Sequence, residues 1–262
     1  MAGQIHIPTL APEVVTQIGS INITNTMINA WLAIIIFLIL GIFVRRSVRL
    51  RPGKLQNTCE YFLESVLGYF DQVTGSRKKT VTFLPIVGSI FFFVLLSNWL
   101  GLLPGTGSIL NGHTMVLRPA NTDLNLTVAM ALVSVIASHI YAFVAIGFFT
   151  HIGKFIQIKN LFLSIKKGPI AIFSAIIEFA VGLIEIVSEI AKVLSLSLRL
   201  FGNIFAGEVL ISVISALVAA LVPTPFMLLE LLVGLIQAAV FAMLTIVYMT
   251  VATSEPHGAE EH

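Results

Sequence analysis

Long apolar runs with almost no charge decide what this chain can fold into. They cover residues 27–44, 82–103, 124–149, 170–221 and 226–252. A transmembrane helix needs about 20 such residues, whereas a membrane β-strand shows about 10 residues of alternating polarity. Of all residues 57% are hydrophobic and 11% charged, against about 25% charged in soluble domains. The sequence therefore predicts an all-α integral membrane protein with about five membrane-embedded helices in a single membrane domain, 27–253.

The basic residues gather in two regions. Twelve of the fifteen Lys and Arg residues lie within 45–79 or within 154–167. If each apolar run crosses the membrane once, both regions lie on the same side, which the positive-inside rule makes cytoplasmic. We therefore expect segment 1–26 outside and the acidic tail 254–262 inside. Residues 55–75 mix apolar and acidic positions, which is typical of an interfacial amphipathic helix.

The run 170–221 is too long for a simple crossing. As one helix its 52 residues would measure about 78 Å at about 1.5 Å per residue, against a hydrocarbon layer about 30 Å thick. It must therefore break, tilt steeply or lie partly along the membrane. The sequence VPTPF at 222–226 predicts a turn, because two prolines interrupt a helix interior. The last two helices are thus expected to form a long, strongly tilted hairpin.

One face of the run 170–221 carries polar residues. Its members are Glu178, Glu185, Glu189, Lys192, Ser195, Arg199 and Asn203. Positions 178, 185, 192 and 199 are spaced by seven, and a helix drifts only about 20° per seven residues. The other members lie three or four positions from Lys192 or Arg199 and so share that face. A polar stripe at membrane depth needs a partner or water beside it.

Arg199 has the clearest need of an outside partner. No acidic residue lies three or four positions from it, and a charge at the centre of a membrane helix costs about 2.5–3.5 kcal/mol on insertion scales. We expect its partner on another helix or another chain. For Glu185, Glu189 and Lys192 the alternative is that they neutralise one another on a wet surface near the basic loop.

The last run carries a matching polar pair, Glu230 and Gln237, again seven apart. Arg199 and Gln237 have their midpoint at residue 218, and Glu208 and Glu230 have theirs at 219. Two antiparallel helices joined there would place Arg199 opposite Gln237 and Glu208 opposite Glu230. If Glu208 and Glu230 approach each other there, they cannot both ionise easily, so one should keep its proton.

Structural alternatives stand beside these interpretations. Glu208 and Glu230 can be protonated, hydrogen-bonded structural acids, and Asn203 and Gln237 can serve as hydrogen bonds between helices. Asp123 can be a helix N-cap. His139, a lone histidine in the run 124–149, is more often structural than functional.

Several classes of protein are not supported by the sequence. The single cysteine, Cys59, excludes an internal disulfide and a cysteine-based metal cluster. We find no phosphate-binding glycine loop, no His-x-x-x-His pair and no nucleophile elbow. We expect no cofactor, no bound nucleotide and no nucleic acid. Segment 1–26 does not have the pattern of a signal peptide.

A family resemblance follows from these segments. The stretch LSLSLRLFGNIFAGEVL at 194–210, with LIQAAVFAMLTIVYMTVA at 235–252 and LRPANTDLNLTVAMAL at 117–132, closely resembles the a subunit of F-type ATP synthases, the membrane stator that faces the rotor ring. The order of the elements along residues 27–253 is similar too.

The resemblance implies roles for the residues above. Arg199 would face the proton-carrying carboxylate of each rotor subunit, with Asn203 and Gln237 positioning it. Glu208 and Glu230 would lie in the half-channel from the outside, with Asp123 near it. The half-channel to the inside would be lined by Glu185, with Glu178, Glu189, Lys192 and Ser195 on the same stripe. Some relatives carry a histidine at one of the two positions matched by Glu208 and Glu230.

The resemblance also implies partners. These would be a rotor ring of c subunits, peripheral-stalk b subunits, other ATP synthase subunits and membrane lipid. The chain would not be an enzyme by itself, and a bacterial inner membrane, or alternatively an organelle membrane, would contain it. A version that translocates Na⁺ is the runner-up. A self-contained transporter would need an internal carboxylate for Arg199 and an inverted repeat, and a structural scaffold would tolerate Arg199→Ala.

Overall fold

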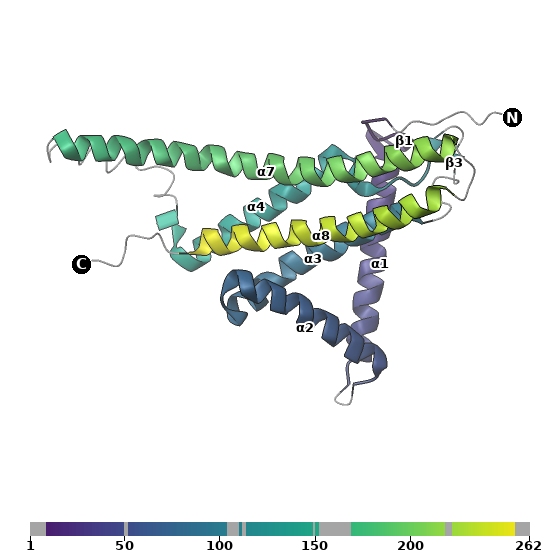
Figure 1. The fold of residues 1–262 in the computed structure, drawn as a ribbon, viewed down its shortest axis with the longest axis horizontal. Helices are drawn as coiled ribbons and strands as arrows, with labels where there is room; N and C mark the ends of the chain where they lie inside the picture. The colour runs from purple at the N-terminus through teal and green to yellow at the C-terminus, as the bar shows by residue number, and fades with distance from the viewer. Residues whose placement is uncertain are drawn as a thin grey trace.

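The structure, a computed structural model, describes residues 9–49, 52–103, 110–111, 114–148, 150–151, 169–217 and 222–254. Helices dominate it (Figure 1). They are α1 (Asn25–Ser47), α2 (Lys54–Thr74), α3 (Arg77–Leu102), the short η2 (Ala120–Thr122), α4 (Leu124–Ile146), α7 (Pro169–Leu217) and α8 (Pro223–Thr253). All but α2 and η2 are long and apolar enough to cross a membrane. The predicted all-α membrane fold with about five embedded helices is confirmed, while the predicted basic loop 154–167 and the tail 255–262 lie outside the described residues.

Two short antiparallel hairpins were not predicted from the sequence. In the first, β1 (Val14–Ile18) pairs with β2 (Ile21–Thr24), and in the second, β3 (Leu110–Asn111) pairs with β4 (Thr114–Met115). The first hairpin leads directly into α1, whose N-terminus is capped because the Thr24 hydroxyl accepts a hydrogen bond from the backbone N–H of Met27. The segment before the first crossing is therefore anchored to the membrane helices.

Helices α2 and α3 meet at a tight corner. Helix α2 ends at Thr74 and is capped by Gly75, whose φ of 65° lies in the left-handed region that glycine adopts without strain. Helix α3 then begins at Arg77, five residues before the predicted run. The prediction followed only the apolar residues, whereas the helix also includes the basic residues 77–79 in its first turn. Arg77 donates hydrogen bonds to Glu64 at 2.6 Å and to Asp71 at 2.8 Å, which joins the two helices.

Helix α7 is one unbroken helix of 49 residues. At about 1.5 Å per residue it is about 73 Å long, more than twice the hydrocarbon thickness of about 30 Å. Of the three alternatives, breaking does not occur. Figure 1 shows α7 and α8 running side by side and across the direction of α1, so the pair is strongly tilted if α1 stands upright.

The start of α8 differs from the prediction. Pro223 and Pro225 belong to its first turn instead of forming a separate turn at 222–226. A proline fits there because the first N–H groups of a helix have no partner within the helix. The last helix therefore begins three residues earlier than predicted.

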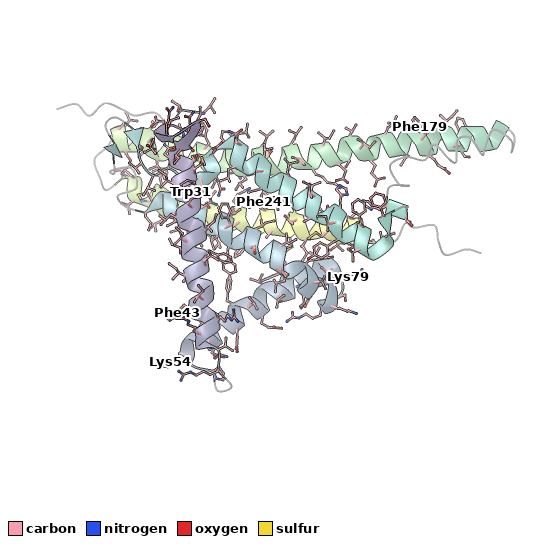
Figure 2. The ribbon with its side chains drawn as sticks, turned by 180° about the vertical axis from the view of Figure 1, so that it is seen from behind. Trp31, Phe43, Lys54, Lys79, Phe179 and Phe241 are labelled. Carbon is pink, nitrogen blue, oxygen red and sulfur yellow. The ribbon has the colours of Figure 1, made fainter. Side chains whose placement is uncertain are left out.

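The helices pack around α8. Helix α8 contacts α3 and α4, and α7 contacts α4 and α8. Phe241, fully buried, lies near the middle of this packing (Figure 2). Hydrogen bonds reinforce it: the Asn98 amide donates to the Gly234 carbonyl at 3.1 Å, and the hydroxyls of Ser134 and Thr245 are 2.9 Å apart. The site described next lies along the seam between α7 and α8.

Apolar side chains cover the outside of the molecule. Leu38, Ile39 and Phe43 of α1 are each more than half exposed. Figure 2 also shows the end of α7 that carries Phe179 projecting past the other helices. Large exposed apolar surfaces of this kind are expected where a protein faces lipid or other membrane subunits.

Candidate functional site

Arg199 is exposed on α7. Its Nη2 donates a long hydrogen bond of 3.4 Å to the hydroxyl of Ser195, one turn earlier on the same helix. Within the described ranges no carboxylate forms an ion pair with it. The guanidinium is therefore exposed, and no described carboxylate compensates its charge; a partner on another helix or chain stays a prediction.

An amide pair joins α7 to α8 one turn beyond Arg199. The Asn203 amide donates to the Gln237 carbonyl oxygen at 2.8 Å, and Gln237 is only 4% exposed. The sequence predicted Arg199 opposite Gln237, and the hydrogen bond is made by Asn203 instead. The α7–α8 register is thus displaced by about one turn from the predicted pairing at this depth.

Glu230 of α8 is buried against α7. Its carboxyl group lies so close to Gly207 that a β-carbon at position 207 would fall on it. No described residue hydrogen-bonds to its Oε1. A buried carboxyl group with an unfilled hydrogen-bonding position can exchange a proton with a neighbouring donor or water.

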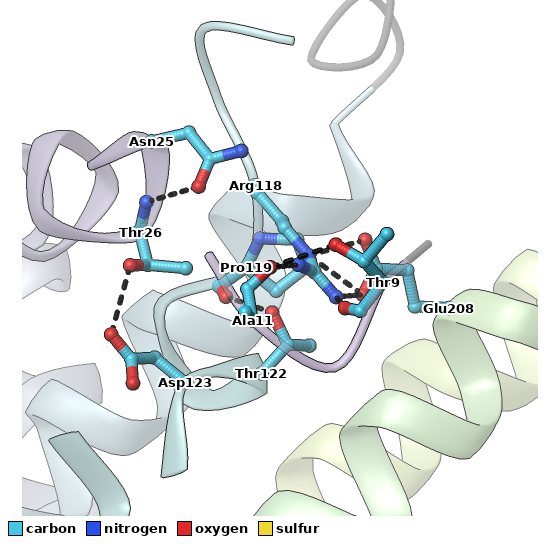
Figure 3. A network of polar contacts seen from close by, with 9 residues as sticks. All are labelled: Thr9, Ala11, Asn25, Thr26, Arg118, Pro119, Thr122, Asp123 and Glu208. Carbon is cyan, nitrogen blue, oxygen red and sulfur yellow. Dashed lines mark hydrogen bonds and ion pairs between the residues drawn. The ribbon is translucent and has the colours of Figure 1, made fainter. Parts of the chain in front are cut away.

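Glu208, the next residue along α7, has a partner that the sequence did not predict. Arg118 donates through Nε to Glu208 Oε1 at 2.8 Å and through Nη2 to Oε2 at 2.9 Å. The same guanidinium donates to the carbonyls of Thr9 and Ala11 at 2.9 and 3.3 Å (Figure 3). The Glu208 charge is therefore compensated by Arg118, and that Glu208 faces Glu230 stays a prediction.

Asp123 has the structural role that was one of its two predicted alternatives. One carboxylate oxygen caps α4 by accepting from the backbone N–H of Asn125 at 2.9 Å, and the other accepts from the Thr26 hydroxyl at 3.2 Å. Figure 3 shows this link between α1 and α4 beside the Arg118 network. Asp123 thus holds together the segments that surround the far end of the α7–α8 seam.

A second charged cluster lies on α7 before Arg199 in the sequence, whereas Glu208 comes after it. The Lys192 ammonium donates to Glu189 Oε1 at 2.6 Å, so the predicted mutual neutralisation occurs for this pair. Glu189 Oε2 is 3.5 Å from His139 Nε2, and His139 Nδ1 is 3.0 Å from His151 Nε2. His139 is therefore not isolated: its two ring nitrogens lie beside Glu189 and His151.

The remaining members of the stripe extend this line toward the start of α7. Glu185 is partly buried and Glu178 is exposed. Because α7 is continuous, their spacing of seven keeps them on the face that carries Lys192 and Arg199. The described residues contain no group of three or more His, Cys, Asp or Glu side chains that could hold a metal ion.

These features define a class: an all-α membrane protein whose two long, tilted helices carry a continuous line of ionisable and amide groups through the hydrophobic region. Comparison with known proteins specifies the family. Residues 27–250 match the family described as ATP synthase A chain.

Relatives agree along nearly the whole chain. The ATP synthase subunit a of Moorella thermoacetica is 33% identical over 239 residues, covering 91% of this chain and 94% of that protein. The ATP synthase subunit a of Mycobacterium marinum is 35% identical over 243 residues, 90% of each chain, and that of Gloeobacter violaceus is 34% identical over 244 residues, 91% of this chain and 88% of that protein. The chain belongs to the a-subunit family of F-type ATP synthases, as its resemblance indicated.

Proposed function

We propose that this chain is the proton-translocating stator subunit of its ATP synthase, in which Arg199 faces the carboxylates of a rotor ring and separates two offset half-channels. The observation that carries the proposal is the exposed Arg199, on a helix long and apolar enough to cross a membrane, with no carboxylate partner among the described residues. A cation in such a position is stable only if a partner outside the chain supplies the opposite charge.

The chemistry follows from the position of this charge. A rotor carboxyl group in lipid prefers to be neutral, because a charged side chain is costly there. When it reaches Arg199, the positive charge stabilises its ionised form and its proton is released. The guanidinium stays protonated throughout, so it also repels a proton that would otherwise pass directly between the half-channels.

The two half-channels are assigned to the two clusters that flank Arg199. Glu230 and the Arg118-bound Glu208, with Asp123 behind them, would line the route from the outside. Asn203 and Gln237 lie between this cluster and Arg199 and would position it. The route to the inside would follow the remaining polar face of α7. Its members are Glu178, Glu185, Glu189, Lys192 and Ser195.

This assignment includes an orientation and partners. Segment 9–24 would lie outside and the end of α8 in the cytoplasm of a bacterial cell, so each proton that crosses under a membrane potential of 100 mV gains about 2.3 kcal/mol. The tilt of α7 and α8 would let them follow the curved surface of a ring of c subunits. The exposed face of α1 and the corner between α2 and α3 remain available to peripheral-stalk b subunits and to lipid.

The test is ATP-driven acidification of inverted vesicles that contain the whole ATP synthase, with wild type and Arg199→Ala compared at matched assembly. We expect acidification to vanish in Arg199→Ala while the passive proton leak persists or rises. Arg45→Ala, which removes an exposed arginine at the end of α1, is the matched control and should pump normally. Acidification by wild type in sodium-free buffer distinguishes proton from sodium transport. Normal pumping by Arg199→Ala would refute the proposal.

A further inference from the structure

A chain of four ionisable side chains connects α7 to the end of α4. Successive members are Lys192, Glu189, His139 and His151, with contacts of 2.6, 3.5 and 3.0 Å between neighbouring polar atoms. Two of these residues lie on α7, one lies near the end of α4, and His151 lies five residues beyond the last residue of α4. The two histidines are not part of the polar stripe to which a function was assigned above.

The arrangement is suited to carrying protons. In a neutral imidazole one nitrogen bears the proton and the other accepts one, and histidine changes its charge between about pH 5 and 8. His139 presents Nε2 to Glu189 and Nδ1 to His151. Each ring nitrogen of His139 therefore faces a group that can give or take a proton.

The surroundings of the histidines restrict other roles. His151 is 3% exposed, and its ring packs edge-on against Phe143 at 5.1 Å between centroids. Titratable groups face His139 from α7, where Glu189 is paired with Lys192, and from the end of α4, where His151 lies. Helix α8 contributes Tyr248, over which the Lys192 ammonium lies 5.3 Å from the ring centroid. The two histidines are thus surrounded by protein, and His139 contacts the polar stripe through Glu189.

We propose that His139 and His151 form a proton relay that continues the inner half-channel from Glu189 to the end of α4. In the releasing direction, a proton on the Glu189 carboxyl passes to His139 Nε2. The proton on His139 Nδ1 passes to His151 Nε2, and the proton on His151 Nδ1 passes to a water molecule at the end of α4. One proton enters and one leaves, and the same steps run backwards when ATP hydrolysis drives pumping. The relay rests on the proposed function.

The test uses the whole complex in inverted vesicles and compares wild type with His139→Gln, His151→Gln and the double variant. Glutamine keeps a hydrogen-bonding amide but does not titrate in this range. We expect each single variant to slow ATP-driven acidification on the order of tenfold, below the ~10²–10⁴-fold contribution of positioned acid–base groups. The double variant should be no slower than the slower single variant, because the two act in series, and the pH dependence between about pH 5.5 and 8 should flatten.

Two further variants separate the relay from a structural role. Tyr141→Phe removes the hydrogen bond of Tyr141 to the Thr82 carbonyl from the same part of α4 and should leave the rate and the pH profile unchanged. His139→Phe should be as slow as His139→Gln. Restoration of the wild-type rate and pH profile by glutamine, with only phenylalanine slow, would show a structural hydrogen bond and overturn the relay. If changes at position 139 impair assembly, His151→Gln and His151→Phe provide the same comparison.

The relay and the proposed function fail differently. If Arg199→Ala still pumps, the stator assignment itself is wrong. If Arg199→Ala is inactive while His139→Gln and His151→Gln pump with the wild-type rate and pH profile, only the relay is wrong.

Discussion

The Arg118 guanidinium holds both carboxylate oxygens of Glu208, through Nε at 2.8 Å and Nη2 at 2.9 Å. Arg118 is 4% exposed, and the Glu208 side chain is 14% exposed. Glu208 and Glu230 therefore differ in their surroundings: the first is bound by a buried cation, and the second is buried against Gly207. Two acids that look alike in the sequence are thus given different environments, as expected of groups with different tasks.

The first prediction concerns this ion pair. Glu208→Gln leaves the buried guanidinium of Arg118 without its counter-charge, which typically costs about 3–5 kcal/mol. The double variant Arg118→Gln/Glu208→Gln removes both charges and should be the more stable of the two. Thermal dissociation of the a subunit from the purified complex, read from the amount retained after heating, measures this order.

The control for this experiment is an exposed glutamate far from the ion pair. Glu60→Gln changes an exposed glutamate of α2 and should leave retention unaffected. If the single Glu208→Gln variant is retained as well as wild type, the pair contributes no stability and the charge of Arg118 must be compensated in another way.

The second prediction concerns Asn203 and Gln237. Their hydrogen bond of 2.8 Å lies one turn from Arg199, and hydrogen bonds between membrane helices contribute about 0.6 kcal/mol on average. Asn203→Ala and Gln237→Ala should therefore reduce ATP-driven acidification strongly while lowering the stability of the complex only slightly. A double-mutant cycle in both quantities tests this, and additive losses in acidification would show that the two amides act independently.

The third prediction concerns the dependence of the α2–α3 corner on pH. The nearby Thr80 hydroxyl and the Arg77 guanidinium, which donates a hydrogen bond to it, lower the pKa of Asp71 below its ordinary value. A carboxyl group with a lowered pKa contributes stability above its unfolded pKa, about 3.9, and loses it as the pH falls through the folded value. The corner should therefore be insensitive to pH above about pH 5 and loosen only in stronger acid.

A fluorescent label can be attached to Cys59, which is the only cysteine of the chain and is exposed on α2. Its signal can report on the movement of α2 relative to α3. Fluorescence from a label at Cys59 should change in acid for wild type. Asp71→Asn should abolish that acid transition. A transition of the same midpoint in the variant would assign it to another group.

The helices could be predicted because the bilayer leaves a long apolar run few alternatives to a helix. The register of α7 and α8 could also be estimated from the positions of their polar residues. The predicted midpoints were 218 and 219, while the contacts of Asn203 with Gln237 and of Gly207 with Glu230 have midpoints of 220 and 218.5. At the amide pair the midpoint lies two residues further on, which displaces the pairing by four residues, about one turn, and replaces Arg199 by Asn203 as the partner of Gln237.

The contacts between distant segments could not be predicted. Arg118 lies just before η2, outside any helix. Helical periodicity does not predict which residues such a side chain contacts, so its ion pair with Glu208 could be seen only in the structure. His139 is separated from Glu189 by fifty positions, and their contact depends on which face of α4 packs against α7. The only hint for Arg118 was that it is the single basic residue between the second and third apolar runs.

The last prediction concerns Gly207, which makes room for the Glu230 carboxyl group. In Gly207→Ala the new β-carbon would occupy the position of that carboxyl group, and overpacking of this kind typically costs about 1–3 kcal/mol. We expect slower ATP-driven acidification because Glu230 is displaced from the seam. Gly207→Ala/Glu230→Asp, with a shorter acid that leaves space for the methyl group, should recover part of the rate. Gly41→Ala adds a methyl group where no atom lies within 4 Å and is the matched control. Wild-type pumping by Gly207→Ala would show that the position of Glu230 against α7 is not required.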